Sequence, residues 1–222
     1  MAPVVLLASN SPRRRQLLAL AGLDFEVRAA EIDESRLPAE PPGDYVLRLA
    51  RGKAQAAGQF ARPGQLVLAA DTTVADGDVI LGKPAGPEEA FQMLAALRGR
   101  DHMVYTAVAV LDPASGRLMA DLCGTRVWMR PYSDREIAAY IASGDPFDKA
   151  GAYAIQNAAF HPVERIEGCY PCVVGLPLCR AIGLLRAFGV TPPHDLTSDC
   201  RNGLNSACNV YRRLLDAGQN GS

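Results

Sequence analysis

The sequence predicts an α/β protein with a mixed β-sheet flanked by helices. Two buried strands are expected because the runs at 4–8 and 66–70 are continuously apolar and of strand length. Amphipathic stretches of helical length lie between and after them, and Asp76-Gly77 is a strong hairpin signal. Strands that alternate with helices favour parallel pairing, and the hairpin adds antiparallel strands, so the sheet should be mixed.

The first elements follow from capping residues. After the strand at 4–8, Ser11 suits a helix N-cap, Pro12 suits the first helical position, and Gly22 ends the helix. A second amphipathic helix is expected at 44–60. The chain therefore opens with a strand, a tight turn and a helix.

The later elements follow in the same way. The strand at 66–70 should end at Asp71, and Ser133 and Glu136 form a capping-box pattern for a helix. The other expected elements are a helix from Pro87 that Gly99 closes, strands at 102–111 and 117–129, a helix to about Ser143, a loop that enters a strand at 145–156, a short strand at 173–174 and a helix at 178–188.

The chain should form one domain at 1–190 with a C-terminal extension at 191–222. A length of 222 residues suits a single domain or two tightly joined lobes. Pro192-Pro193 breaks the last helix, and the residues beyond it are polar and rich in Gly, Asn and Ser. We expect the extension to be partly disordered or to carry a short helix.

The cysteines allow more than one interpretation. Cys169 and Cys172 form a C-x-x-C motif, and Cys200 and Cys208 lie in the extension. Four such thiols could bind zinc. Reduced, unrelated cysteines are favoured, because the motif runs into an apolar segment that is typical of a strand; a disulfide in the extension stays open.

Charge and hydropathy exclude several classes of partner. The net charge of −1 offers no field that would attract nucleic acid or an acidic membrane. No apolar run approaches the roughly 20 residues that a membrane span needs. The apolar N-terminus lacks a basic region and resembles a strand more than a signal peptide. We expect a soluble, cytoplasmic protein.

A candidate anion site lies at the first turn of the first helix. Ser9 precedes the helix, and Arg13, Arg14 and Arg15 occupy its first turn. That end of a helix already carries partial positive charge, so three cations there are unfavourable unless an anion is present. The free backbone N–H groups at this end of the helix also favour an anion, and phosphate suits such a site. Any one arginine could instead be solvated or paired with a carboxylate.

Two charged residues fall where a buried strand and an apolar helix face are expected. Asp71 ends the strand at 66–70, and ligands of open α/β sheets gather at such strand ends. A carboxylate there can hold a metal or take a proton from water. Lys53 falls on the apolar face of its helix, so it either snorkels to solvent or enters a polar cleft that holds negative charge.

Other signals are weaker. Glu34 and Lys83 carry charge in short polar segments, and the Gly-Lys-Pro around Lys83 is not a phosphate-binding P-loop motif. His102 is the single histidine before residue 150. The sequence therefore offers few side chains for a histidine-based metal site or a Ser-His-Asp triad. Residues 148–156 alternate small and polar side chains, which suits either the wall of a ligand site or a plain edge strand.

Seven segments together resemble the Maf family of nucleotide pyrophosphatases. They occur in family order over about residues 4–189, and read LLASNSPRRRQLL, EIDES, RLARGKA, AADTTV, LGKP, DKAGAYAIQ and IEGCY with VVGLPL. The resemblance implies a twisted mixed sheet in an ITPase-like fold, two lobes with a central cleft, and a homodimer. Cys172 and His161-Pro162 depart from the family pattern, and the extension lies outside it.

The resemblance also implies roles for individual residues. Asp71 would be the catalytic proton acceptor, and Arg13, Thr72 and Gln156 would select the substrate as in the branch that acts on dTTP and UTP. The amide of Gln156 offers one donor and one acceptor, which could pair with two groups along the edge of thymine or uracil.

We therefore expect a metal-dependent hydrolase that converts dTTP and UTP to the monophosphate and pyrophosphate, in nucleotide-pool house-cleaning with a link to cell-division arrest. Mg²⁺ or Mn²⁺ would be held by Asp71 and Glu34. Phosphate groups would be bound by Ser9, Arg13, Arg14, Lys53 and Lys83. Two alternatives stay open: a nucleotide-binding regulator of septum formation with little catalysis, and a pyrophosphatase for modified or non-standard nucleotides.

Overall fold

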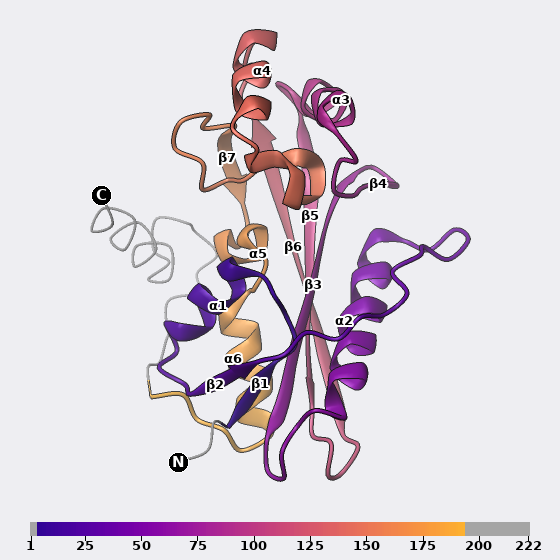
Figure 1. The fold of residues 1–222 in the computed structure, drawn as a ribbon, viewed down its shortest axis with the longest axis vertical. Helices are drawn as coiled ribbons and strands as arrows, with labels where there is room; N and C mark the ends of the chain where they lie inside the picture. Colours follow the sequence, from indigo (N-terminus) through magenta and orange to yellow (C-terminus); the bar gives the residue numbers. More distant parts are fainter. Residues whose placement is uncertain (1–3, 194–222) are drawn as a thin grey trace.

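The computed structural model describes residues 4–193 and contains a twisted mixed sheet of seven strands within that range (Figure 1). The strand order is β2-β1-β3-β5-β6-β7, with β4 also paired to β3. The strands are β1 (Val5–Leu7), β2 (Phe25–Val27), β3 (Leu66–Asp76), β4 (Val79–Leu81), β5 (Asp101–Leu111), β6 (Leu118–Met129) and β7 (Val163–Glu167).

Helices cover the sheet along its length. They are α1 (Pro12–Ala19), α2 (Pro42–Gly58), α3 (Pro87–Leu97), α4 (Asp134–Ala142), α5 (Tyr170–Val174) and α6 (Leu178–Ala187), with short 3-10 turns η1 (Asp145–Asp148) and η2 (Ala150–Ala152). No helix in residues 4–193 has the length and hydropathy that crossing a bilayer requires.

Pairing directions confirm the mixed sheet. β1 runs parallel to β2 and β3, whereas the β3–β4, β3–β5, β5–β6 and β6–β7 pairs are antiparallel. The hairpin expected at Asp76-Gly77 joins β3 to β4, and Gly77 has the positive φ of 61° that such a turn requires.

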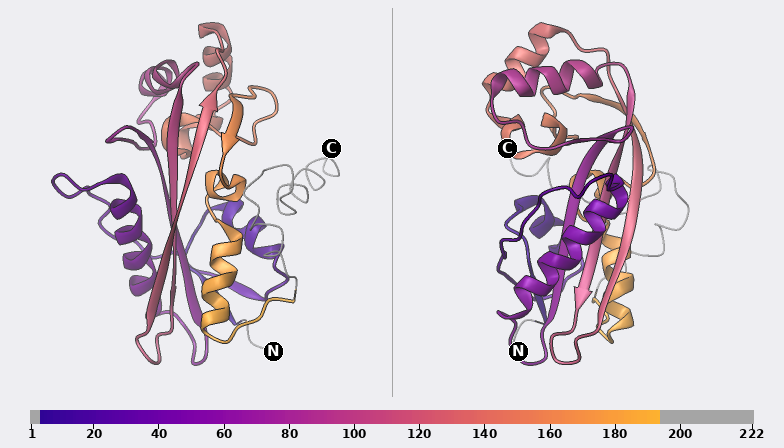
Figure 2. Two further views of the ribbon diagram at one scale, coloured as in Figure 1. Left: turned by 180° about the vertical axis from the view of Figure 1, so that it is seen from behind. Right: turned by 90° about the vertical axis from the view of Figure 1, so that its right-hand side faces the viewer.

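Three apolar clusters hold the layers together. On one face of the sheet, α1 and α6 pack around Leu17, Leu18 and Ile182. On the other face, α2 packs through Val46 and Ala50. At the far end of the long strands β3, β5 and β6, the helices α3 and α4 pack on a third cluster (Figure 2). The molecule therefore has two lobes that share the three long strands.

An interruption along one edge of β3 positions the site. On the side opposite β5, β1 pairs with β3 as far as Leu68, and β4 pairs with it from Val74 onward. Between these positions that edge has no strand partner in the described residues. Asp71 lies in the middle of this gap, between the two lobes.

The structure corrects three expectations. Asp71 does not end its strand, because β3 continues to Asp76 and pairs with β5 along its length. The segment at 145–156 enters no strand, since Gly151 and Ala152 have positive φ and form a 3-10 turn. The third correction concerns residues 173–174.

Residues 173–174 lie in the short helix α5 and form no strand. Pro171 occupies the first turn, and Gly175 ends the helix in the left-handed conformation with φ of 116°. A short apolar run such as this cannot be assigned to helix or strand from its pattern alone. The strand-like interpretation of Cys169 and Cys172 is wrong for the same reason.

Other expectations are confirmed. Ser11 caps α1 by accepting a hydrogen bond from the backbone N–H of Arg14, and Ser133 and Glu136 form the capping box of α4. No pattern in the sequence predicted β2 or β7, which are short strands at the two edges of the sheet. The expectations for residues 194–222, including Cys200 and Cys208, fall outside the described residues.

Candidate active site

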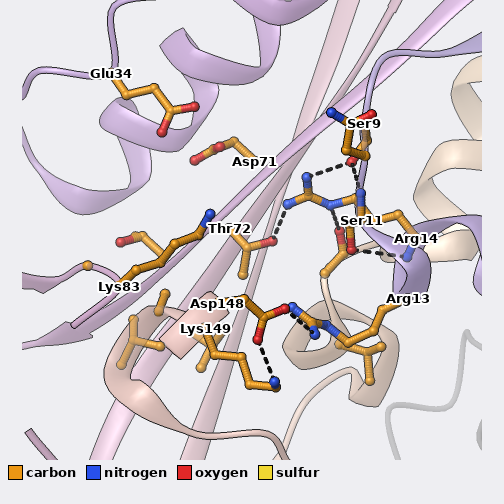
Figure 3. Close-up of a pocket in the computed structure, with 18 of the residues that line it drawn as sticks. Ser9, Ser11, Arg13, Arg14, Glu34, Asp71, Thr72, Lys83, Asp148 and Lys149 are labelled. Atoms are coloured by element: carbon orange, nitrogen blue, oxygen red, sulfur yellow. Dashed lines mark hydrogen bonds and ion pairs between the residues drawn. The ribbon is translucent and has the colours of Figure 1, made fainter. Parts of the chain in front are cut away.

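A cleft of about 760 Å³ opens at the gap in β3 (Figure 3). Its walls come from the start of α1, the loop before α2, the middle of β3, the segment after β4, the η1–η2 region and the end of α5. Every candidate site residue lines this cleft, namely Ser9, Arg13, Arg14, Glu34, Lys53, Asp71, Thr72, Lys83 and Gln156. Arg15, the third arginine of α1, is not among the lining residues.

Lys53 lies between two carboxylates. Its Nζ is 2.5 Å from Oδ1 of Asp71 and 2.6 Å from Oε1 of Glu34. The side chains of Lys53 and Asp71 are only 14% and 10% exposed, so the ammonium is held in the cleft and does not snorkel to solvent. Burial of Lys53 on the apolar side of α2 is compensated by these two partners.

The ionisation of Asp71 reflects opposing effects. Burial raises the pKa of this carboxyl above its usual value, while the charges of Lys53 and Arg14 lower it and the nearby charge of Glu34 raises it. The net direction is upward. A carboxylate with a raised pKa is a better proton acceptor than an ordinary aspartate.

Arg14 is partly buried and joins three parts of the cleft. Its Nε donates to the carbonyl of Gly175 at 2.8 Å, Nη1 to Oγ of Ser9 at 3.2 Å, and Nη2 to Oγ1 of Thr72 at 3.1 Å. Burial lowers the pKa of the guanidinium, and Asp71 counteracts this. An arginine does not lose its proton under these conditions, so a fixed positive charge faces the cleft.

The hydroxyl of Thr72 is committed to a chain of hydrogen bonds. Oγ1 of Thr106 donates to the carbonyl of Cys172 at 2.7 Å, so Thr72, 2.9 Å away, must donate its own hydrogen to Thr106. Arg14 donates to Thr72 from the other side. In this arrangement Thr72 can only accept a hydrogen bond from a ligand.

Arg13 connects the two lobes. It pairs with Asp148 at 3.3 Å, and Asp148 in turn accepts a hydrogen bond from Lys149 at 2.5 Å. Burial raises the pKa of Asp148, but the hydrogen bonds and positive charges of Lys149 and Arg13 together outweigh burial, so the pKa is lowered. The side chain of Arg13 remains 29% exposed and reaches the cleft (Figure 3).

Ser9 and Lys83 add donors on opposite walls. Oγ of Ser9 accepts from the backbone N–H of Ser11 at 3.3 Å and from Arg14, which leaves its own hydrogen available. Lys83 points towards the middle of the cleft from the segment after β4 (Figure 3). The cleft thus carries Arg13, Arg14, Lys53 and Lys83 around one buried carboxylate.

The residues present suit a metal that arrives with a polyphosphate. Asp71 and Glu34 both line the cleft, but residues 4–193 contain no group of three or more His, Cys, Asp or Glu side chains arranged to hold a metal ion. Mg²⁺ is usually bound by one or two carboxylates together with substrate phosphates and water. Asp71 and Glu34 fit that pattern.

Some cleft residues had no signal in the sequence. Asp148 and Lys149 belong to a segment with two open interpretations, and the partner of Asp148 lies 135 residues away along the chain. Tyr45 lines the cleft from the first turns of α2 and resembles any core aromatic residue. Burial raises its pKa, so its hydroxyl stays protonated.

The model of the Maf-like protein family matches residues 4–188, which include every lining residue of the cleft. The chain belongs to the Maf family. Its curated relatives include a dTTP/UTP pyrophosphatase of Anaeromyxobacter dehalogenans, 50% identical over 88% of this chain and 99% of the relative. Others of the same name occur in Geotalea uraniireducens (47% identity, 83% and 95% coverage) and Dehalococcoides mccartyi (39%, 93% and 96%).

Among solved structures, the Staphylococcus aureus Ham1 protein matches this Maf family member with a TM-score of 0.42 and 14% identity. The match covers 83% of this chain and 96% of that one. It is too distant to support conclusions about the site.

Proposed function

We propose that the chain hydrolyses nucleoside triphosphates, with dTTP and UTP preferred, to the monophosphate and pyrophosphate. The observation that carries the proposal is the buried carboxylate of Asp71, which shares one cleft with Lys53, Arg14, Arg13 and Lys83. A triphosphate supplies the negative charge that this set of cations needs. The names of the relatives, at 39–50% identity, support the same substrates.

Asp71 acts as the general base. Its raised pKa suits the removal of a proton from water as the water oxygen attacks the α-phosphorus. The new P–O bond forms while the bond between the α-phosphorus and its bridging oxygen breaks. Pyrophosphate leaves with that oxygen, and the proton resides on Asp71 until solvent removes it.

The cations stabilise the phosphate charges. Arg14 uses three of its five N–H donors within the protein, and the other two remain for phosphate oxygens. Ser9 donates its free hydrogen, and Lys53, Lys83 and Arg13 add charge from three other walls. Such preorganised donors are effective because they need little reorganisation when charge develops on the phosphates.

Asp71 and Glu34 would hold a divalent cation, Mg²⁺ or Mn²⁺, which supplies further charge stabilisation at the phosphates when it is bound. Lys53, which contacts both carboxylates, would then share them with the cation.

Gln156 selects the base. Thymine and uracil present two acceptors with a donor between them, and one amide can satisfy two adjacent groups. Ile155 and Tyr153 line the same part of the cleft and provide an apolar wall for the ring. Arg13 and Thr72 complete the set that we propose for substrate choice.

Pyrophosphate release from a panel of triphosphates with Mg²⁺ or Mn²⁺ tests the proposal. We expect the highest kcat/KM for dTTP and UTP. A preference for modified pyrimidine or inosine triphosphates would keep the reaction and change the substrate. No release from any triphosphate, together with tight nucleotide binding, would favour the regulator of septum formation instead.

We also propose that the protein is a cytoplasmic homodimer that binds neither nucleic acid nor membranes. Its near-zero net charge supports the absence of nucleic-acid and membrane binding. Light scattering on the purified chain measures the oligomeric state, and a mass equal to one chain would contradict the dimer.

A further inference from the structure

A cluster of three cysteines lies behind the cleft wall that α5 forms. Cys123 is on β6, Cys169 precedes α5, and Cys172 is within it; all three are free thiols. The thiols of Cys169 and Cys172 are close enough to Cys123 to be the main influences that lower its pKa. The sulfur of Cys172 also lies 3.3 Å from the backbone carbonyl of Cys123. Nothing in the proposed hydrolysis uses these groups.

The backbone is pressed against β6 where the cluster forms. Gly168 has φ of 129°, and a Cβ at this position would lie 2.9 Å from Oγ1 and 3.1 Å from Cα of Thr125. The same hydroxyl accepts from the N–H of Cys169 at 3.0 Å and donates to its carbonyl at 3.1 Å. These contacts hold Cys169 beside Cys123.

Charge and access favour reaction at this cluster. Hydrogen bonds from Cys169 and Cys172, assisted by the charge of Arg180, lower the pKa of the Cys123 thiol to about 3. Its thiolate form is therefore stabilised, and the thiolate is the reactive form of cysteine. Cys169 is partly exposed, whereas Cys123 and Cys172 are buried, so a small oxidant reaches the cluster beside Cys169.

We propose that Cys123 and Cys169 are a redox modification site that hydrogen peroxide converts to a disulfide. The Cys123 thiolate attacks the peroxide, so that an S–O bond forms and the O–O bond breaks. The departing hydroxide takes the proton of Cys169. Cys169 then displaces hydroxide from the Cys123 sulfur, and solvent protonates that hydroxide. The two sulfurs lose two electrons, and the peroxide gains them as it becomes water.

The cluster is connected to the cleft through α5. The carbonyl of Cys172 accepts from Thr106, which bonds Thr72, and the carbonyl of Gly175 accepts from Arg14. α5 packs on β5, β6 and α1 (Figure 1), so a new covalent bond at its start shifts both carbonyls. Oxidation therefore misplaces Arg14 and Thr72 and slows hydrolysis, a consequence that rests on the proposed function.

The full-length chain is reduced, desalted, treated with hydrogen peroxide, alkylated and digested with trypsin. We expect the peptide 118–126, which carries Cys123, joined to the peptide 166–180. Because that second peptide also carries Cys172 and Cys179, fragmentation in the mass spectrometer must locate the bond at Cys169. The Cys123→Ser and Cys169→Ser variants should lose the bond, and Cys179→Ser should keep it.

Turnover of dTTP is measured on the same samples. Peroxide should lower kcat/KM of the native chain and of Cys179→Ser about tenfold, because small misplacements of positioning groups are costly. Dithiothreitol should restore it, and Cys123→Ser should be insensitive.

Absence of the 123–169 bond, or equal inactivation of Cys123→Ser, would overturn the proposal. A bond that forms without loss of turnover would overturn the link to the cleft. The mass measurement needs no turnover, so a reduced chain that hydrolyses nothing would count only against the proposed function.

Discussion

The Nζ of Lys53 lies 2.5 Å from the carboxylate of Asp71, and the two side chains come from α2 and the middle of β3. This pair places a cation directly beside the proposed base. The same ammonium contacts Glu34 at 2.6 Å, so the protonation of Asp71 depends on both neighbours. The first two predictions follow from this arrangement.

Asp71→Asn should keep the fold and lose most turnover, because an amide cannot accept the proton of water. The expected loss in kcat is on the order of 10²–10⁴-fold. Steady-state pyrophosphate release with dTTP measures it, and circular dichroism checks the fold. Asp76→Asn is the matched control, since Asp76 is on the same strand but outside the cleft. Near-normal turnover by Asp71→Asn would remove Asp71 from the mechanism.

Substitution of Lys53 and Glu34 should move the pH profile in opposite directions. Burial raises the pKa of Asp71, Lys53 lowers it and Glu34 raises it. Lys53→Met should therefore shift the acid limb of kcat/KM to higher pH, and Glu34→Gln should shift it to lower pH. Both variants will have a lower kcat/KM, so the informative quantity is the pH at which the acid limb of the profile lies. Shifts in the same direction would contradict the role of Asp71 as base.

Gln156→Leu should weaken discrimination among bases and leave the chemistry intact. The side chain lines the cleft and is proposed to pair with the base, so its loss removes binding shared by ground and transition states. We expect KM for dTTP and UTP to rise about tenfold, which corresponds to the loss of one or two hydrogen bonds. KM for CTP should change less. An equal change for all three substrates would place Gln156 away from the base.

Arg14→Lys should destabilise the folded state as well as slow hydrolysis. A lysine cannot reproduce the three directed bonds of Arg14 to Ser9, Thr72 and Gly175. The expected loss is about 2 kcal/mol in the free energy of unfolding. Urea denaturation measures it. Arg15→Lys is the control, because Arg15 is one residue further along α1 and outside the cleft. Equal stability of the two variants would contradict the structural role of Arg14.

His102 should make the fold sensitive to mild acid. Burial lowers its pKa from 6.5 to about 4, and its Nε2 lies 2.8 Å from the hydroxyl of Tyr153. Since the unfolded chain binds this proton first, stability is present above pH 6.5 and is lost as the pH falls towards 4. The loss is about 3 kcal/mol. In unfolding measurements at several pH values, His102→Asn should show a shallower slope over this window than the native chain does.

Prediction from the sequence succeeded where a local pattern carries the information. Ser11 and Pro12 mark the start of α1 by capping chemistry, although the helix ends at Ala19 and not at Gly22, and the Asp76-Gly77 turn specifies the β3–β4 hairpin. The position of Lys53 on an apolar stripe left two interpretations open, and the structure shows the one in which partners in a cleft compensate its burial.

Prediction failed where distant contacts decide. Asp71 was expected at a strand end; β3 instead continues because β5 pairs with it on the other side. The feature that opens the cleft is the gap between β1 and β4, which only the register reveals. Asp148 carried no signal because its partner Arg13 is remote in the chain. Neither the gap along β3 nor the Arg13–Asp148 pair can be predicted from residues that are neighbours in the sequence.

The two lobes have no connecting linker, since β3, β5 and β6 run through both of them. A hinge between the lobes would therefore have to bend three hydrogen-bonded strands together. Admission of a nucleotide must depend on local rearrangement of the rim, while the reacting centre stays rigid. Such a division lets loop residues diverge towards new bases over generations without disturbing the chemistry, and it makes this architecture a suitable scaffold for engineered substrate preference.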